Sequence, residues 1–468
     1  MSAWPKSRSC SCTSACSTSW RPRRRRTWGA TGPEPTGSLG YWTWSPTGAP
    51  SSGCPASRCT PSAYGVPYTA KMGDSMEQMS WNFGTELAGP RVLFAAVPKS
   101  LSTNDTFQSL LQLFAWSMRC MVAGAWPTAR HDLTPFGDRD KARRARAGQP
   151  FRFVGALLQV RADWDWLKKV LKLPGWGDRQ ICWRCHATRE NFRHCGPDAP
   201  WRAQRRTGEE FVAAIRAAGR VPSPLLGCPG LRVKHFVIDW MHCVDLGIAQ
   251  DCLGQLFWDV LPLLGAGTRK QQVRLLWMRI RGFYQQRRPR AQLQTLTEEM
   301  VRLRGKPPKL RSKAGECRYL IPFGAALAAE FADGSEYRRT VARVCALLLR
   351  LAELISAEPL AVEELRDACC RFAILYSTLG AQAAAAGEDW RWRPKPKLHM
   401  LQELCEYQAR ELQASPRDFW NYVDESWCGW IGDAGGRRGG HKTVTTVATN
   451  IIQRFRASAG ELVGLECS

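Results

Sequence analysis

The chain has 468 residues, of which 44% are hydrophobic, and this length and composition predict two to four structural units with a folded core. Its 66 Lys and Arg residues against 41 Asp and Glu give a net charge of +25, which favours a polyanionic partner such as DNA, although Arg-rich codon usage would also raise the charge. No apolar run reaches the roughly 18 residues of a membrane helix and no P-loop motif occurs, so we expect neither a membrane nor a nucleotide cofactor.

Residues 1–62 differ in composition from the rest of the chain. They are rich in Ser, Pro, Arg, Trp and Cys and lack helical or strand periodicity, so we interpret them as a disordered segment or as the product of a shifted reading frame. The arginines at positions 23–26 are typical of a nuclear import signal, and equally of a solvated charge run.

Apolar periodicity predicts strands and helices between residues 63 and 264, which we interpret as the first part of an α/β core. Residues 92–97 predict a strand, and residues 107–121 predict an amphipathic helix because apolar side chains recur there at helical spacing. Apolar runs at 154–160 and 231–238 predict two further strands, both buried.

The remainder of the chain is mostly helical in its pattern. Helical spacing at residues 243–264 and through most of 265–393 predicts helices, and we interpret 265–393 as an α-helical insertion. Residues 394–457 form the final part of the predicted core, with a helix at 443–456, and residues 458–468 form a tail.

Carboxylates follow both predicted buried strands. Asp163 and Asp239 stand at the strand ends, and Asp424 and Glu425 begin a later predicted helix. Mg²⁺ and Mn²⁺ prefer carboxylate oxygens, and two such ions held by converging acids support cleavage of phosphodiester bonds. A single acid in such a place more often caps a helix or forms a turn, so only the set favours a catalytic metal site.

Cys182 and Cys185 form a C-x-x-C pair, a spacing that is typical of half a zinc site. The 19 cysteines of the chain are scattered, unlike a disulfide framework, and this favours a reducing compartment. His194 and Cys195 would complete a local zinc site, and free thiols are the remaining alternative.

The order of these features resembles that of DDE transposases, in particular the CACTA-type transposases and the V(D)J recombinase lineage. The shared order is an Asp, a C-x-x-C pair, a D-x-x-H box at 239–242, a helical insertion, KPKLH at 395–399 and a late Glu, within about residues 60–457. The resemblance implies an RNase H-like mixed sheet interrupted by the helical insertion. It also implies DNA as partner, a homo-oligomer on DNA ends, a nuclear location, catalytic Mg²⁺ or Mn²⁺, and structural Zn²⁺.

The resemblance assigns catalytic roles to individual acids. Asp163 matches the second catalytic Asp of the family, and Asp165 is a competitor that is less well placed at the strand end. Glu425 matches the final Glu, with Asp424 as its competitor. Asp239 and His242 match the D-x-x-H box, so Asp239 joins the expected catalytic set, while His242 is expected to brace the core.

The resemblance also assigns the zinc ligands, and the residues themselves suggest a DNA contact. Cys182 and Cys185 match one half of the zinc site, and His399 with Cys405 matches the other half, so the local set with His194 remains an alternative. A basic Gly-rich loop after Glu425 is expected to contact DNA through three cations, which are Arg437, Arg438 and Lys442.

The first catalytic Asp of the family has no clear counterpart. Tyr64 stands at the most similar position, and Asp74 lies nearby. A phenol titrates near pH 10 and cannot replace a bridging carboxylate at neutral pH. The sequence therefore predicts DNA cleavage by a transposase-like protein that is impaired unless another acid is supplied. The alternative is a non-enzymatic, zinc-stapled nucleic-acid-binding protein derived from a transposable element.

Overall fold

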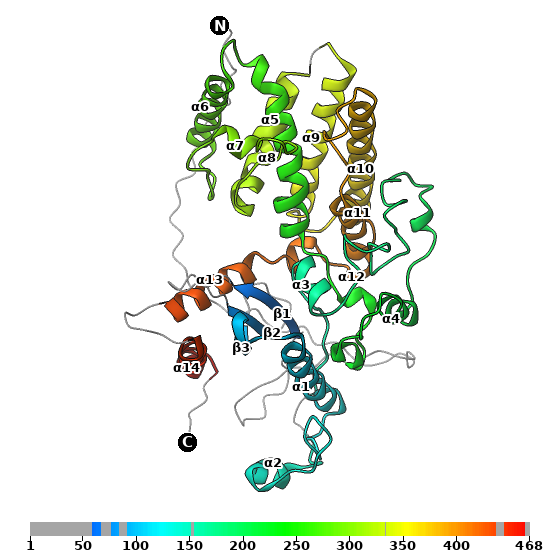
Figure 1. Cartoon of the computed structure of the whole chain (residues 1–468), viewed down its shortest axis with the longest axis vertical. Coiled ribbons are helices and arrows are strands. Elements are labelled where there is room, and N and C mark those ends of the chain that lie inside the picture. The colour runs from blue at the N-terminus through cyan, green and yellow to red at the C-terminus, as the bar shows by residue number, and fades with distance from the viewer. Residues whose placement is uncertain are drawn as a thin grey trace, which may run out of the picture. The chain divides into compact units, whose positions relative to one another are not determined.

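Helices account for most of the described chain, so the predicted α/β class with an RNase H-like mixed-sheet core is wrong (Figure 1). The computed structural model describes residues 59–66, 76–83, 91–150, 154–332, 334–436 and 444–463, all of which belong to one unit, Tyr41–Ser468. Most of the segment predicted as disordered or spurious lies outside these ranges.

The sheet of the described residues is small and entirely antiparallel. It consists of β1 (Cys59–Val66), β2 (Met76–Phe83) and β3 (Arg91–Pro98), in the order β1-β2-β3, with Tyr64 of β1 opposite Gln78 of β2. The strand predicted at 92–97 is confirmed, since it lies within β3. On one flank, the Phe94 ring of β3 packs edge-on against the Phe114 ring at 5.3 Å between centroids.

Two C-terminal helices complete this part of the fold. Helix α13 (Tyr422–Gly436) contacts β1, and α14 (Val444–Val463) contacts both β3 and α13. An apolar cluster joins β3 to the two helices, and its buried members are Ala96, Ile431, Val447 and Ile451. The helix predicted at 443–456 is therefore confirmed, and its apolar face is the one that covers the sheet.

Neither of the buried runs at 154–160 and 231–238 forms the predicted strand. Val160 and Phe236 meet in a single parallel bridge, in which the Val160 amide donates to the His235 carbonyl at 2.8 Å. A 3₁₀ turn, Val233–His235, interrupts the second run. Val160 and Phe236 are nevertheless buried, so the apolar pattern identified the burial correctly. Such a run does not specify a neighbouring strand, and this is why the prediction failed.

Helix α1 (Asn104–Ala123) contains the predicted amphipathic helix at 107–121. Thr103 and Thr106 form a reciprocal capping pair at its start, and Gly124 ends it in the left-handed region at φ 67°. Its apolar stripe packs into the main core through Leu111, Phe114 and Met118. Short helices follow in the chain, namely α2 (Lys141–Arg146), α3 (Trp164–Lys169) and α4 (Gly208–Ala217).

A helical bundle occupies the middle of the chain (Figure 1). It begins with a π-helical turn, Met241–Ile248, that runs directly into α5. Helix α8 packs against α5 and α9, and α10 packs against α9 and α11. The bundle helices and those that follow are α5 (Ala249–Val260), α6 (Arg269–Arg287), α7 (Glu298–Val301), α8 (Ala314–Glu330), α9 (Glu336–Leu354), α10 (Val362–Ala385), α11 (Pro396–Gln402) and α12 (Ala409–Leu412). The helical pattern predicted for residues 243–393 is confirmed.

One close approach inside the bundle requires glycine. A Cβ atom added to Gly254 of α5 would lie 2.6 Å from the Leu310 amide nitrogen, because the strand-like segment before α8 runs along α5 there. The Leu310 amide donates to the Gln250 carbonyl at 2.8 Å, which fixes that segment on the helix. Among the described helices, none combines the length and apolar character that crossing a membrane requires.

Candidate metal centre and acidic cluster

The C-x-x-C pair lies in a tight buried turn. An isolated bridge between Gln180 and Thr188 joins the two sides of the turn, and a second bridge, between Cys185 and Arg205, joins the turn to a later segment. The Arg184 amide donates to Cys182 Sγ at 3.3 Å, and both cysteine side chains are fully buried. An amide that donates to sulfur favours the thiolate, which is the form that binds metals.

His399 and Glu403 complete a group of four that could hold a metal ion. They stand one helical turn apart on α11 and its continuation, so both side chains project from one face toward the cysteine turn. His399 Nε2 lies 3.4 Å from Cys185 Sγ and 3.7 Å from Glu403 Oε1, and the ligand atoms of all four residues lie within 4.8 Å of one another.

Charges around the group favour its anionic form. Burial alone would raise the pKa of Glu403, but the bonds from Arg205 and the charges of Arg205, His399 and Arg184 lower it to about 2. Burial likewise opposes ionisation of Cys182, yet its hydrogen bond with Cys185 and the nearby His399 bring the pKa of Cys182 to about 5. Burial and the Cys182 neighbour raise the pKa of Cys185, as expected for two adjacent thiols of which one ionises first.

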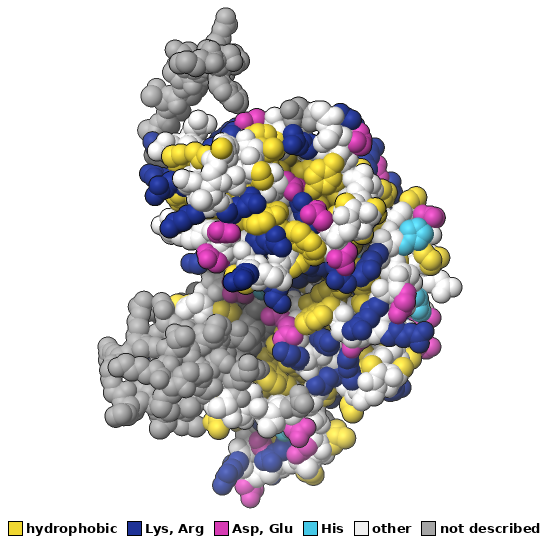
Figure 2. Space-filling model, turned by 45° about the horizontal axis from the view of Figure 1, so that its top comes forward, with side chains coloured by type: hydrophobic (Ala, Val, Ile, Leu, Met, Phe, Trp, Pro, Cys, Tyr) yellow, Lys and Arg dark blue, Asp and Glu magenta, His cyan; other side chains and the backbone are white. Residues whose placement is uncertain are grey.

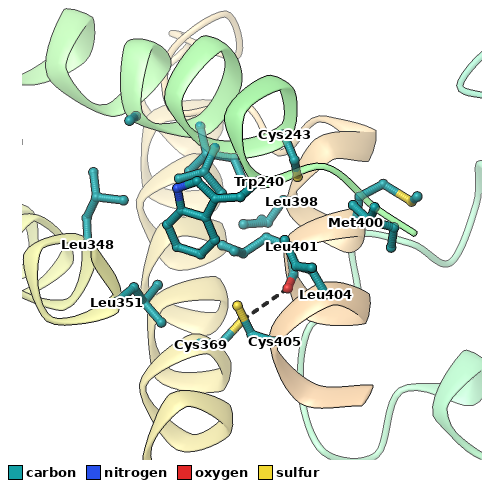
Figure 3. Packing of buried hydrophobic residues seen from close by; sticks show 14 of the residues in the cluster. Trp240, Cys243, Leu348, Leu351, Cys369, Leu398, Met400, Leu401, Leu404 and Cys405 are labelled. Carbon is teal, nitrogen blue, oxygen red and sulfur yellow. Dashed lines mark hydrogen bonds between the residues drawn. The ribbon is translucent and has the colours of Figure 1, made fainter. Parts of the chain in front are cut away.

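Cys405 lies away from this group, in the apolar core. Its sulfur lies among Cys369, Leu401 and Leu404, and the Cys369 thiol donates to the Leu401 carbonyl at 3.6 Å (Figure 3). The expected fourth ligand is therefore replaced by Glu403 in the described structure. The reason is helical geometry, because position 403 follows position 399 by one turn on the same face, whereas position 405 lies two residues farther along, in the π-helical segment Glu403–Gln408, and projects from another face.

The local alternative for the zinc site is not assembled either. His194 is half exposed and pairs with Asp198 at 3.2 Å, while the Cys195 thiol contacts Ser377 Oγ at 3.2 Å. Neither residue belongs to the group around Cys182 and Cys185. A sequence signal for Glu403 did exist, since H-x-x-x-E places a His and a carboxylate on one helical face.

The three predicted catalytic acids lie around one histidine. His242 Nδ1 lies 2.5 Å from Asp239 Oδ2, and His242 Nε2 lies 3.6 Å from Glu425 Oε1. Burial would lower the pKa of His242, but the bond to Asp239 and the charges of Asp239, Asp163 and Glu425 raise it. Segments around positions 163, 239 and 425 are thus brought together at His242.

The three acids differ in their surroundings. Asp239 is buried, and its carboxylate accepts bonds from the amides of Met241, His242 and Asn421 as well as facing the His242 ring, so its oxygens are committed to the fold. Asp163 accepts the Trp166 amide at 2.7 Å as the cap of α3, which leaves its other oxygen available for a second contact.

Glu425 is the most accessible acid of the cluster. Its side chain is 48% exposed, and burial of the remainder raises its pKa, with Asp239 and Asp163 raising it further and His242 lowering it. Repulsion from the neighbouring carboxylates thus favours the protonated form of Glu425. A small pocket lined by Trp164, Asp239 and His242 opens beside the cluster.

The place of the first catalytic Asp is only partly described. The β1 backbone, which carries Tyr64, contacts both α3, which follows Asp163, and α13, which carries Glu425. Asp74 and the expected DNA-contacting residues Arg437, Arg438 and Lys442 lie outside the described residues.

Comparison with protein-family models gives no matching family, and comparison with curated proteins gives no similar sequence. The assignment of a function to this chain therefore depends on its own geometry and charge. On the face shown in Figure 2, Lys and Arg side chains are spread over the whole described surface, as the net charge of +25 leads one to expect.

Proposed function

We propose that this chain binds DNA and cleaves its phosphodiester bonds with Mg²⁺ or Mn²⁺ held at Asp163 and Glu425, on a core fastened by Zn²⁺. The observation that carries the proposal is the contact of the His242 ring with Asp239 at 2.5 Å and with Glu425, 183 positions away, at 3.6 Å, with Asp163 close enough to act on the same ring through its charge. Asp239 acts as a positioning residue, because its hydrogen bonds fix the ring of His242 between the two more accessible acids.

Zinc is the metal that best fits the four-residue group. Two thiolates, an imidazole and a carboxylate are all zinc ligands, and ligand atoms about 2.0–2.3 Å from tetrahedral Zn²⁺ lie about 3.3–3.8 Å apart. The distances from His399 Nε2 to Cys185 and Glu403, 3.4 and 3.7 Å, agree with this. The ion would fasten the turn at Cys182 to α11 and would take no part in cleavage.

The reaction requires a water molecule and a divalent cation in addition to the acids of this cluster. A water oxygen attacks the phosphorus, the bond to a sugar oxygen breaks, and that oxygen takes up a proton, which leaves one phosphate end and one hydroxyl end. A divalent cation at Asp163 and Glu425 would activate the attacking oxygen and stabilise the leaving oxygen.

Nicking of supercoiled plasmid DNA in Mg²⁺ or Mn²⁺ tests the proposal. Asp163→Asn and Glu425→Gln are expected to abolish nicking while DNA binding persists. Asp165→Asn is the matched control, because Asp165 is a partly exposed neighbour paired with Lys169 at 2.5 Å. Nicking that survives in both variants, or wild-type protein that never nicks DNA, would overturn the proposal.

Two observations favour a non-enzymatic alternative, a zinc-stapled nucleic-acid-binding protein. The oxygens of Asp239 are occupied by backbone amides and His242, and Tyr64 stands where the family has its first acid. This protein would bind DNA with steep salt dependence, and loss of Asp163 or Glu425 would leave its behaviour unchanged.

A further inference from the structure

A groove beside α11 combines tryptophans with cations. It is lined by Trp176, Trp390, Arg189, Arg193, Arg393 and Lys395, among other residues. Asp251 is the one acid among the described lining residues, and Lys395 neutralises it at 2.7 Å. The three arginines therefore leave the groove with a net positive charge, which suits a chain of phosphates.

Trp176 offers a surface for stacking. Its side chain is 43% exposed, although large aromatic residues usually bury most of their area. Lys168 Nζ lies 5.0 Å over one face of the Trp176 ring, so a base would stack on the other face, with a cation behind the ring. A base inside a duplex cannot reach such a ring without leaving its stack, so the ring favours unpaired bases.

The groove continues along α10. A second hollow shares Arg193, Arg393 and Pro394 with the first, and its other lining residues include Gly380, Ala381 and one acid, Asp389. The two hollows thus form one trough with the shared arginines at its middle. A trough of this kind accommodates an extended strand better than it does a compact ligand.

The trough also lies next to the acidic cluster. The Trp176 and Trp164 rings pack edge-on at 5.4 Å between centroids, and Trp164 directly follows Asp163 and lines the pocket that contains Asp239 and His242. We propose that this trough binds single-stranded DNA, with an unpaired base stacked on Trp176 and phosphates held by Arg193 and Arg393. The inference rests on the proposed function only in taking DNA as the ligand.

Fluorescence anisotropy with fluorescein-labelled oligo-dT, in buffer without added Mg²⁺ or Mn²⁺, tests this inference. Trp176→Ala is expected to weaken binding about 5- to 100-fold, whereas Trp176→Phe keeps a stacking ring and most of the affinity. Both positions of the Arg193→Ala/Arg393→Ala double variant are exposed. In this variant the slope of the logarithm of the binding constant against the logarithm of the salt concentration is expected to become less steep by about 1.4. Arg343→Ala on α9 is the matched control, because Arg343 is exposed and lies outside the trough.

The inference is overturned if the trough variants bind oligo-dT as the wild type does, or no more weakly than Arg343→Ala. Equal affinity for a duplex of the same length would overturn the single-strand assignment. Because the assay omits catalytic cations, its outcome is separate from that of plasmid nicking. If nicking depends on Asp163 but Trp176→Ala binds oligo-dT as the wild type does, only the inference about the trough fails. If Trp176→Ala weakens binding but nicking does not depend on Asp163, only the cleavage proposal fails.

Discussion

Cys185 Sγ lies 3.4 Å from His399 Nε2, although 214 positions separate the two residues in the chain. With Cys182 and Glu403 they form a buried group on which the stability of the surrounding core is expected to depend. The contact links the cysteine turn to α11. Both of these elements support the segments that carry the acidic cluster.

Loss of a ligand should release the zinc ion. Cys185→Ser and His399→Ala are expected to lack zinc and to lose stability on the order of several kcal/mol, because binding of a structural ion is coupled to folding. Cys405→Ala is the control, since Cys405 lies in the apolar core and should retain a full zinc content. Elemental analysis of purified protein with thermal unfolding measures both effects. Zinc lost from Cys405→Ala and kept by His399→Ala would reverse the assignment.

Glu403→Gln separates a ligand from an ordinary buried anion. A Gln amide is a poor zinc ligand, so we expect zinc affinity to fall by at least about 10-fold in a chelator competition. Glu411→Gln removes the other, more exposed carboxylate that Arg184 contacts, at 2.5 Å, and should leave zinc affinity unchanged. If Glu403→Gln and Glu411→Gln bound zinc equally well, Glu403 would serve only to neutralise Arg184 and Arg205.

Asp245 should make stability depend on pH. Burial raises its pKa to about 7, even though Arg318 and the hydroxyl of Tyr422 favour its charged form. Its folded pKa thus exceeds the unfolded value near 3.9, so its contribution to stability is complete below about pH 4 and is lost as pH rises to about 7.

Chemical unfolding of the wild type and Asp245→Asn between pH 4.5 and 7.5 measures this dependence. The stability of the variant relative to the wild type should increase as pH rises, because only the wild type loses a proton at this position. A stability difference that stays constant over the range would contradict the raised pKa.

Gly254→Ala should destabilise the bundle by about 1–3 kcal/mol, since the added methyl group would lie 2.6 Å from the Leu310 amide nitrogen. Gly282→Ala on α6 is the matched control, because a Cβ atom there meets nothing within 4 Å. It should be neutral, or stabilising by up to about 1 kcal/mol, through helix propensity alone. Urea unfolding measures the stability of the Gly254→Ala and Gly282→Ala variants. Similar stabilities would mean that the segment near Leu310 shifts with little loss of free energy.

Local patterns predicted the helices and the burial of this chain well. Periodicity located α1, α9 and α10, because a helix satisfies its own backbone and shows its apolar stripe in sequence. The runs at 154–160 and 231–238 were assigned to the wrong element, because a strand requires a partner that an apolar run does not identify. Between these two runs, the pairing that the described residues show is the parallel bridge of Val160 and Phe236.

Long-range groupings could be predicted only in part. Motif order linked Cys182 and Cys185 to His399, and it linked Asp163 to Glu425. It missed Glu403, because a carboxylate is not distinctive in sequence until the helical face of His399 is considered. The sequence also did not show that Asp239 accepts hydrogen bonds from three backbone amides. Two of those donors are local, but the third, the Asn421 amide, is 182 positions away.

Direct ligation of a divalent cation by Asp163 is the central claim, and a change of ligand type tests it most directly. Asp163→Cys replaces a hard carboxylate by a softer thiolate, which binds Mg²⁺ poorly and Mn²⁺ better. Plasmid nicking by Asp163→Cys is expected in Mn²⁺ and not in Mg²⁺, while Asp165→Cys behaves as the wild type in both ions. Equal nicking by Asp163→Cys in Mg²⁺ and Mn²⁺, or none in either ion, would contradict the claim.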